Sequence, residues 1–108
     1  MDHLLCEQII PVGEGQFPVS ARNLHMFLES RADFSTWIKE RIQQYGFQEG
    51  ADYQVFHQTV ENLSGGRPSV EYLITINMAK ELSMVERNER GKQARRYFIA
   101  CEERLKAI

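Results

Sequence analysis

Residues 70–87 have the sequence VEYLITINMAKELSMVER, in which the spacing of the apolar side chains changes partway along. Over residues 70–76 the apolar side chains alternate, which predicts a strand with one mostly apolar face. Over residues 77–87 they recur at helical spacing, at Met78, Leu82 and Val85. This stretch therefore predicts a strand that leads directly into an amphipathic helix.

The residues before this strand predict its hairpin partner. Tyr53–His57 is rich in residues that favour strands. The connection 58–69 contains Ser64-Gly65-Gly66-Arg67-Pro68, a cluster that excludes regular structure and predicts a turn. We therefore expect a long β-hairpin whose tip presents Arg67 far from the core, where exposed loops often bind partners. The alternative is an ordinary hairpin tip with no binding role.

Capping residues predict where the helices begin and end. The side chains of Ser20 and Asp33 can accept hydrogen bonds from first-turn amides, as can Thr75 or Asn77 before the 77–87 helix. Gly46 favours a helix end, because glycine readily takes the left-handed conformation found there. Apolar spacing then predicts three further helices, over residues 20–29, 34–45 and 92–106.

The N-terminal region predicts a small hairpin. Residues 8–12 form a short apolar run, Gly13-Glu14-Gly15 signals a turn, and residues 17–19 are apolar again. Residues 1–108 are therefore expected to form a small single α+β domain. Its predicted order is an N-terminal hairpin, two helices, a long β-hairpin and two C-terminal helices. This order is compatible with a winged-helix arrangement, with the 53–76 hairpin as the wing.

The composition is that of an ordinary globular protein. Hydrophobic residues make up 43% and charged residues 26% of the 108 residues, values that argue against disorder. Cys6 and Cys101 imply no disulfide framework and favour a reducing compartment. No apolar run approaches the roughly 20 residues needed to span a bilayer, and the acidic start differs from a signal peptide. We expect a cytoplasmic protein with no membrane partner.

Charge is unevenly distributed along the chain. The net charge is −2, but residues 1–62 carry four basic and nine acidic side chains, whereas residues 80–108 carry eight and five. The densest basic cluster comprises Arg90, Lys92, Arg95 and Arg96. Since Lys92 and Arg96 are four residues apart on a helix, they share a face that could contact phosphates or another partner. The alternative is a solvated surface neutralised by Glu86, Glu89, Glu102 and Glu103.

Two apolar sets are expected to be buried. The first is aromatic and aliphatic, typical of a core: Trp37, Ile38, Tyr45, Phe47 and Tyr53. The second follows the last helix: Ala94, Phe98, Cys101 and Leu105. Core packing is the simplest role for the second set, but its three-four spacing is also what a helix pair buries. It motivates the hypothesis of a homo-oligomer in which Phe98 and Leu105 are shared between subunits or flank an exposed patch.

No motif with a catalytic mechanism is present. The histidines are scattered and lie at no metal-ligand spacing, and the sequence has neither a nucleophile elbow nor a P-loop. A dispersed pair, Cys6 with His25 or Cys101 with His57, stays open because catalytic pairs meet only in space. We expect a non-enzyme that uses no cofactor or metal.

Several separated segments, in the same order, resemble the AntA/AntB antirepressor family. They are residues 19–25, 37–42, 45–47, 50–53, 78–89 and 91–99. The resemblance implies a phage or prophage product that binds a phage repressor and relieves its repression of transcription. Because the family is also similar to viral N-terminal domains of DNA-binding type, a DNA-binding regulatory domain is the alternative, with Arg67 and the 90–96 cluster on phosphates. The acidic overall charge weighs against this alternative.

Overall fold

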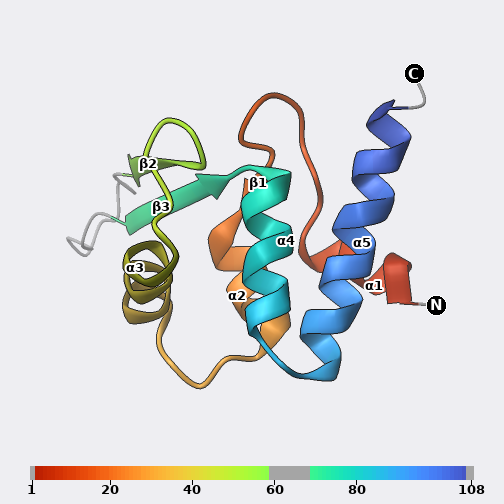
Figure 1. Ribbon diagram of the computed structural model, residues 1–108, viewed down its shortest axis with the longest axis horizontal. Helices are drawn as coiled ribbons and strands as arrows, with labels where there is room; N and C mark the ends of the chain where they lie inside the picture. The colour runs from red at the N-terminus through yellow and green to blue at the C-terminus, as the bar shows by residue number, and fades with distance from the viewer. Residues whose placement is uncertain (1, 59–68, 107–108) are drawn as a thin grey trace, which may run out of the picture.

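A computed structural model describes residues 2–58 and 69–106, which form five α-helices and a three-stranded antiparallel sheet. In chain order these are α1 (Asp2–Ile9), β1 (Val19–Ser20), α2 (Ala21–Leu28), α3 (Phe34–Tyr45), β2 (Tyr53–Gln58), β3 (Ser69–Ile74), α4 (Ile76–Val85) and α5 (Glu89–Lys106). The sheet and α3 lie at one end of the molecule, α1 and α5 at the other, with α2 and α4 between them (Figure 1). The predicted α+β class is confirmed.

The central strand of the sheet is β3. It pairs antiparallel with β1, Val19 opposite Ile74, and with β2, from Tyr53 opposite Ile74 to Gln58 opposite Ser69. The strands of the long hairpin are therefore where the sequence predicts them. Its tip, including Arg67, lies outside the described residues.

Three predicted helix caps are present. Ser20 Oγ accepts a hydrogen bond from Asn23 N–H, and Asp33 Oδ2 accepts one from Thr36 N–H. Thr75 Oγ1 accepts from Met78 N–H at 3.1 Å, which identifies Thr75 rather than Asn77 as the cap of α4. Because residue 75 serves as this cap, the strand ends at Ile74 and not at residue 76 as predicted.

The predicted N-terminal hairpin is wrong. Residues 2–9 form a helix instead, because Cys6 and Ile10, four residues apart, are both buried on its inner side. The apolar run 8–12 that suggested a strand begins in the last turn of this helix and continues beyond its end at Ile9. The turn after it exists, closed by a hydrogen bond from Gly13 N–H to Pro18 C=O, but only Val19 and Ser20 then join the sheet.

The core contains nearly all of the apolar side chains that were expected there. Trp37, Ile38 and Phe47 are buried, and Tyr53 is partly buried against the core. Tyr45 is the exception, since 47% of it is exposed in the last turn of α3. Trp37 links two helices, because its Nε1–H donates to Glu86 Oε1 at 2.8 Å, just after α4.

Within residues 2–58 and 69–106, no helix has both the length and the apolar character needed to cross a membrane.

Candidate interaction surface on the last helix

The start of α5 is fixed by a tight turn from α4. Asn88 Oδ1 accepts from Gly91 N–H at 2.7 Å, and Asn88 Nδ2 donates to Leu28 C=O at 3.4 Å. A Cβ on Gly91 would overlap the carbonyl oxygens of Ser83 and Glu86, so the close approach of the two helices requires glycine. The helix therefore starts at Glu89 and includes Gly91, three residues earlier than the predicted start at residue 92.

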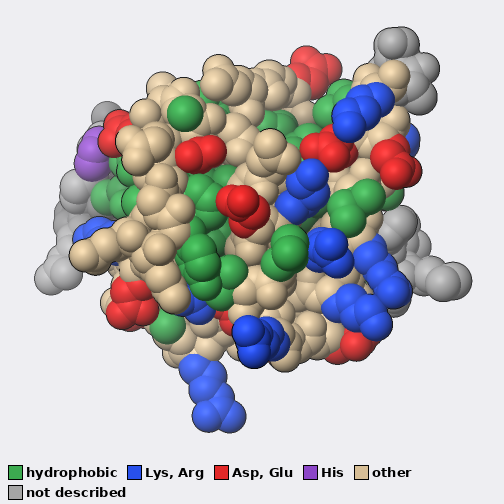
Figure 2. Space-filling view, in the orientation of Figure 1, with side chains coloured by type: hydrophobic (Ala, Val, Ile, Leu, Met, Phe, Trp, Pro, Cys, Tyr) green, Lys and Arg blue, Asp and Glu red, His purple; other side chains and the backbone are tan. Residues whose placement is uncertain are grey.

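The two sides of α5 differ sharply in chemistry. Ala94, Tyr97, Phe98 and Cys101 are buried against the core. Lys92, Arg95 and Arg96 are exposed, and we refer to these three side chains as the basic face. Lys and Arg side chains gather over the first half of α5 (Figure 2).

Two of the four acidic side chains near the basic face have partners elsewhere. Glu86 accepts from Trp37 and from Arg41 Nη2, the latter at 3.1 Å. Glu102 pairs with Lys80 Nζ at 3.0 Å. Among the described residues, no ion pair joins any acidic side chain to Lys92, Arg95 or Arg96. Of the four glutamates in the alternative of a neutralised surface, Glu86 and Glu102 therefore pair with other residues.

Arg90, grouped with the basic face by sequence, has a different environment. Its Nε lies 3.0 Å from Glu29 Oε1, and its guanidinium lies 4.8 Å from the centre of the Phe27 ring. Both partners belong to the C-terminal end of α2, where Glu29 is the left-handed cap. Arg90 thus joins α2 to α5, and its guanidinium is engaged by Glu29 and Phe27 within the protein.

Arg87 is a basic residue that the sequence reasoning did not select. It is exposed in the turn between α4 and α5 and lines a surface cavity of about 380 Å³ with the exposed Tyr45 and Met84. In the sequence, Arg87 could have been noticed because it directly precedes Asn88, where the helical pattern breaks and an exposed turn is expected. The other predicted site residue, Arg67, falls in the segment outside the described residues, so the structure does not place it near the basic face.

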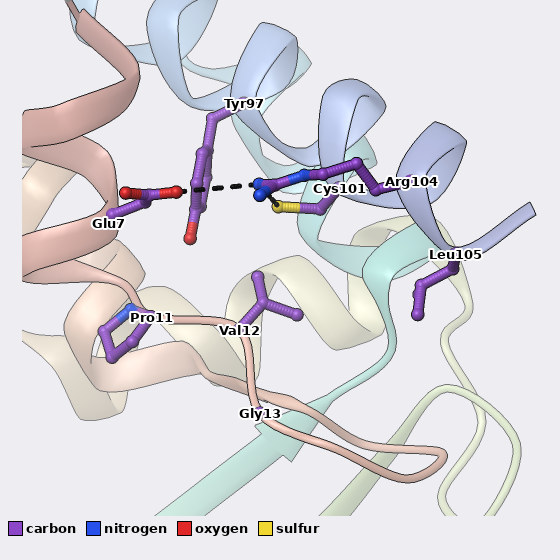
Figure 3. A pocket seen from close by; sticks show the side chains of 8 residues that line it. All are labelled: Glu7, Pro11, Val12, Gly13, Tyr97, Cys101, Arg104 and Leu105. Carbon is purple, nitrogen blue, oxygen red and sulfur yellow. Dashed lines mark hydrogen bonds and ion pairs between the residues drawn. The ribbon is translucent and has the colours of Figure 1, made fainter. Parts of the chain in front are cut away.

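A second cavity lies where α1 and the following loop meet the end of α5. It has a volume of about 430 Å³ and is lined by Glu7, Pro11, Val12, Gly13, Tyr97, Cys101, Arg104 and Leu105. Arg104 reaches from α5 to Glu7 at 3.6 Å and contacts Cys101 Sγ, while Leu105 lies apart from this pair (Figure 3). Burial raises the pKa of Tyr97, and Cys101 beside it adds to the shift.

Leu105 does not extend the buried stripe of α5, since 60% of it is exposed at the rim of this cavity. Phe98, by contrast, is fully buried within the chain. Phe98 is therefore not shared between subunits, and that form of the predicted oligomer contact is wrong. Leu105 alone retains the exposure that such a contact would need.

The two candidate Cys–His pairs are not formed. Cys6 Sγ lies 4.0 Å from the Gln93 carbonyl, whereas His25 Nε2 lies 2.7 Å from the Ala32 carbonyl. Cys101 and His57 lie on α5 and β2, at opposite ends of the molecule (Figure 1). In the part of the chain that the structure describes, no group of three His, Cys, Asp or Glu side chains could hold a metal ion.

Comparison with known proteins gives one family. The sequence model of the AntA/AntB antirepressor family matches residues 19–88, from β1 to the turn before α5. No curated protein and no solved structure matches the chain. The matched range holds α2, the hairpin strands and α4, whereas α1 and the basic face lie outside it. The winged-helix arrangement stays a prediction.

Proposed function

The chain belongs to the AntA/AntB antirepressor family, and on this premise we propose that it binds a phage repressor and relieves that repressor's hold on operator DNA. The physical requirement is linkage, because a partner that prefers the DNA-free repressor shifts the DNA equilibrium. Turning a 99:1 bound population into 1:99 requires about 5.5 kcal/mol of differential affinity. A protein interface of standard size with a well-packed centre supplies that amount.

The observation that carries the proposal is the basic face of α5. Lys92, Arg95 and Arg96 are exposed on one rigid helix, and nearby Glu86 and Glu102 are held by other partners. Such a surface suits an acidic surface of a repressor, where complementary charge speeds encounter and excludes wrong partners. The Arg67 loop is proposed as a further contact. The proposal involves no catalytic step, cofactor or metal, and it places the protein in the bacterial cytoplasm with the repressor.

The test measures operator occupancy by gel shift, using repressors encoded in the same phage genome. The wild-type protein is expected to lower occupancy as its concentration rises. The double variant Arg95→Glu, Arg96→Glu should need a higher concentration for the same release. Lys39→Glu, a charge reversal at an exposed position of α3, is the matched control and should leave release unchanged. If no repressor is captured in a pull-down and occupancy never falls, the proposed function is wrong.

Direct DNA binding is the second candidate, and the same three cationic side chains favour it. A binder of this kind shifts duplex DNA without any repressor, most strongly at about 50 mM salt, where electrostatic contacts are little screened. Reversal of Arg95 and Arg96 should then weaken binding to all sequences and flatten the salt dependence by roughly one unit per lost phosphate contact. No shift at low salt removes this candidate and leaves repressor binding untouched.

We further propose that the protein acts as a homo-oligomer, a state in which one assembly presents several basic faces to a symmetric repressor.

A further inference from the structure

One edge of the sheet is open over part of β2. Thr75 N–H donates to Asp52 C=O at 2.9 Å, so these two residues, next in register after Tyr53 and Ile74, form a hydrogen-bonded pair. Hydrogen-bonded and non-hydrogen-bonded pairs alternate along an antiparallel ladder. The backbone groups of residues 54 and 56 therefore face β3, whereas those of residues 55 and 57 face the outer edge.

The far side of β3 supports this assignment. Val70, opposite His57, should direct its backbone away from β2, and its carbonyl does accept from Arg22 Nη2 at 3.0 Å there. Arg22 also pairs with Glu71 at 2.9 Å, and β1 covers Leu73 and Ile74. That edge of the sheet is thus closed by a side chain and by a short strand.

In the described residues, the edge of β2 is covered only at its start, where Glu49 forms a parallel bridge with Tyr53. Gly50 N–H donates to Tyr53 C=O at 2.7 Å, which closes only its first position. Among residues 2–58 and 69–106, no further hydrogen bond reaches the outward-facing backbone of Val55 or His57. The strand sequence, YQVFHQ, also lacks the Lys, Glu, Asp and Pro residues that usually prevent an edge strand from pairing with another chain.

Phe56 marks where a partner strand would sit. Its side chain is 44% exposed, and alternation places it on the sheet face opposite Val55 and His57, which line a cavity with Phe34. Its neighbour Gln54 is exposed and uncharged. The outer edge therefore combines unpaired backbone groups with one exposed aromatic ring at its centre.

We propose that β2 pairs antiparallel with β2 of a second copy of this chain, with Phe56 on the two-fold axis. In this register Val55 of one copy lies opposite His57 of the other, and each exchanges its outward N–H and C=O groups with its counterpart. Phe56 then faces its own copy in a non-hydrogen-bonded pair, the arrangement in which cross-strand side chains lie closest. The two three-stranded sheets become one continuous sheet.

A second copy fits this edge because the edge is self-complementary. The two outward-facing residues are symmetric about Phe56, so one rotation pairs all of their backbone groups at once. The strand carries no Asp, Glu, Lys or Arg side chain, so pairing two copies brings no such like charges together. The inference does not depend on repressor binding, since it uses the opposite end of the molecule from α5 (Figure 1).

Sedimentation of the full chain over a micromolar concentration series tests the proposal. The wild type is expected to form dimers, and Phe56→Lys should weaken self-association by about tenfold or more, since it places two like charges opposite each other. Val55→Pro should also weaken it, because it removes an outward donor without breaking the ladder to β3. Leu105→Lys, at another exposed apolar position, on α5, is the matched control and should dimerise normally.

Oxidative cross-linking tests the register independently of stability. Phe56→Cys should form a disulfide-linked dimer, because a residue on the axis meets its own copy, whereas Gln54→Cys should cross-link poorly. Far-UV circular dichroism confirms that each variant is folded. A wild type that stays monomeric at high micromolar concentration overturns the proposal, as does a dimer that Leu105→Lys disrupts and Phe56→Lys does not. Equal cross-linking at positions 54 and 56 overturns the register.

Discussion

Arg90 and Lys92 are both basic residues in the first turns of α5, and their side chains have different roles. Arg90 contacts Glu29 and the Phe27 ring, whereas Lys92 extends into solvent. Arg90→Ala should therefore lower the free energy of unfolding by about 1 kcal/mol, the sum of a partly exposed ion pair and a cation–ring contact. Lys92→Ala should change it by less than about 0.5 kcal/mol. Urea unfolding followed by circular dichroism compares the two, and equal losses would contradict the division of roles.

At Gly91, even the addition of a single methyl group should lower the stability of the fold. The added Cβ would overlap the Ser83 and Glu86 carbonyl oxygens, which are backbone atoms and move only if α4 and α5 separate. Gly91→Ala should destabilise the fold by about 1–3 kcal/mol, as expected for overpacking, even though alanine is the better helix former. Thermal unfolding measures this. Ala100→Gly, a replacement in the opposite sense within the same helix, should cost about 1 kcal/mol.

Trp37 is the largest fully buried side chain of the described core. Trp37→Ala should lower the free energy of unfolding by about 3–5 kcal/mol, because it leaves a cavity and removes the donor to Glu86. That is a large part of the roughly 5–15 kcal/mol that holds a domain together. A thermal melt followed by circular dichroism should lose its cooperative transition near physiological temperature, and an unchanged midpoint would contradict the burial of this ring.

At the scale of single elements, the cap of α3 gives a pH-dependent prediction. Hydrogen bonds from Thr36 lower the pKa of Asp33 below its ordinary value of 3.8. The stabilisation is therefore present above 3.8 and is lost as the pH falls through the lower folded-state pKa. Asp33→Ala should lower the Tm at neutral pH, and its difference from wild type should shrink in strong acid. Ser20→Ala, which removes a cap that does not titrate, should show no such convergence.

Helices with a polar cap and a regular apolar face were predictable from the sequence. The bounds predicted for α3 match the structure, because Asp33 caps its start and Gly46 takes a φ of 69° at its end. The prediction of an N-terminal hairpin was wrong for a physical reason. A short apolar run fits both the helical and the strand period, and burial of Cys6 and Ile10 selects the helix. The early start of α5 was missed, since glycine in a first turn resembles a break.

Part of the candidate surface could also be predicted. The sequence identified Lys92, Arg95 and Arg96 as neighbours on a helix, and the structure leaves all three exposed. It did not reveal that Arg90 pairs with Glu29, because that contact spans separate helices. Nor did it reveal the open edge of β2, which depends on strand order and hydrogen-bond register and not on local composition.

On the scale of the whole molecule, the basic face of α5 and the open edge of β2 lie at opposite ends. If the basic face meets an acidic repressor surface, capture of the repressor should slow as salt rises, since screening weakens attraction beyond roughly 8–10 Å. Arg95→Glu with Arg96→Glu should remove most of this salt dependence. Stopped-flow or biosensor association rates measure it, with Lys39→Glu as the control. A capture rate indifferent to salt would contradict the electrostatic contact.

The hydrogen bond between Trp37 and Glu86 also has an optical consequence. The chain contains a single tryptophan, and its indole is buried and bonded to Glu86 just after α4. Its fluorescence emission therefore reports the interior of the protein alone. Emission should be blue-shifted in the folded chain and shift to the red on unfolding. It should stay constant when strands pair or a partner docks, which gives every variant that keeps Trp37 a built-in measure of folding without a label.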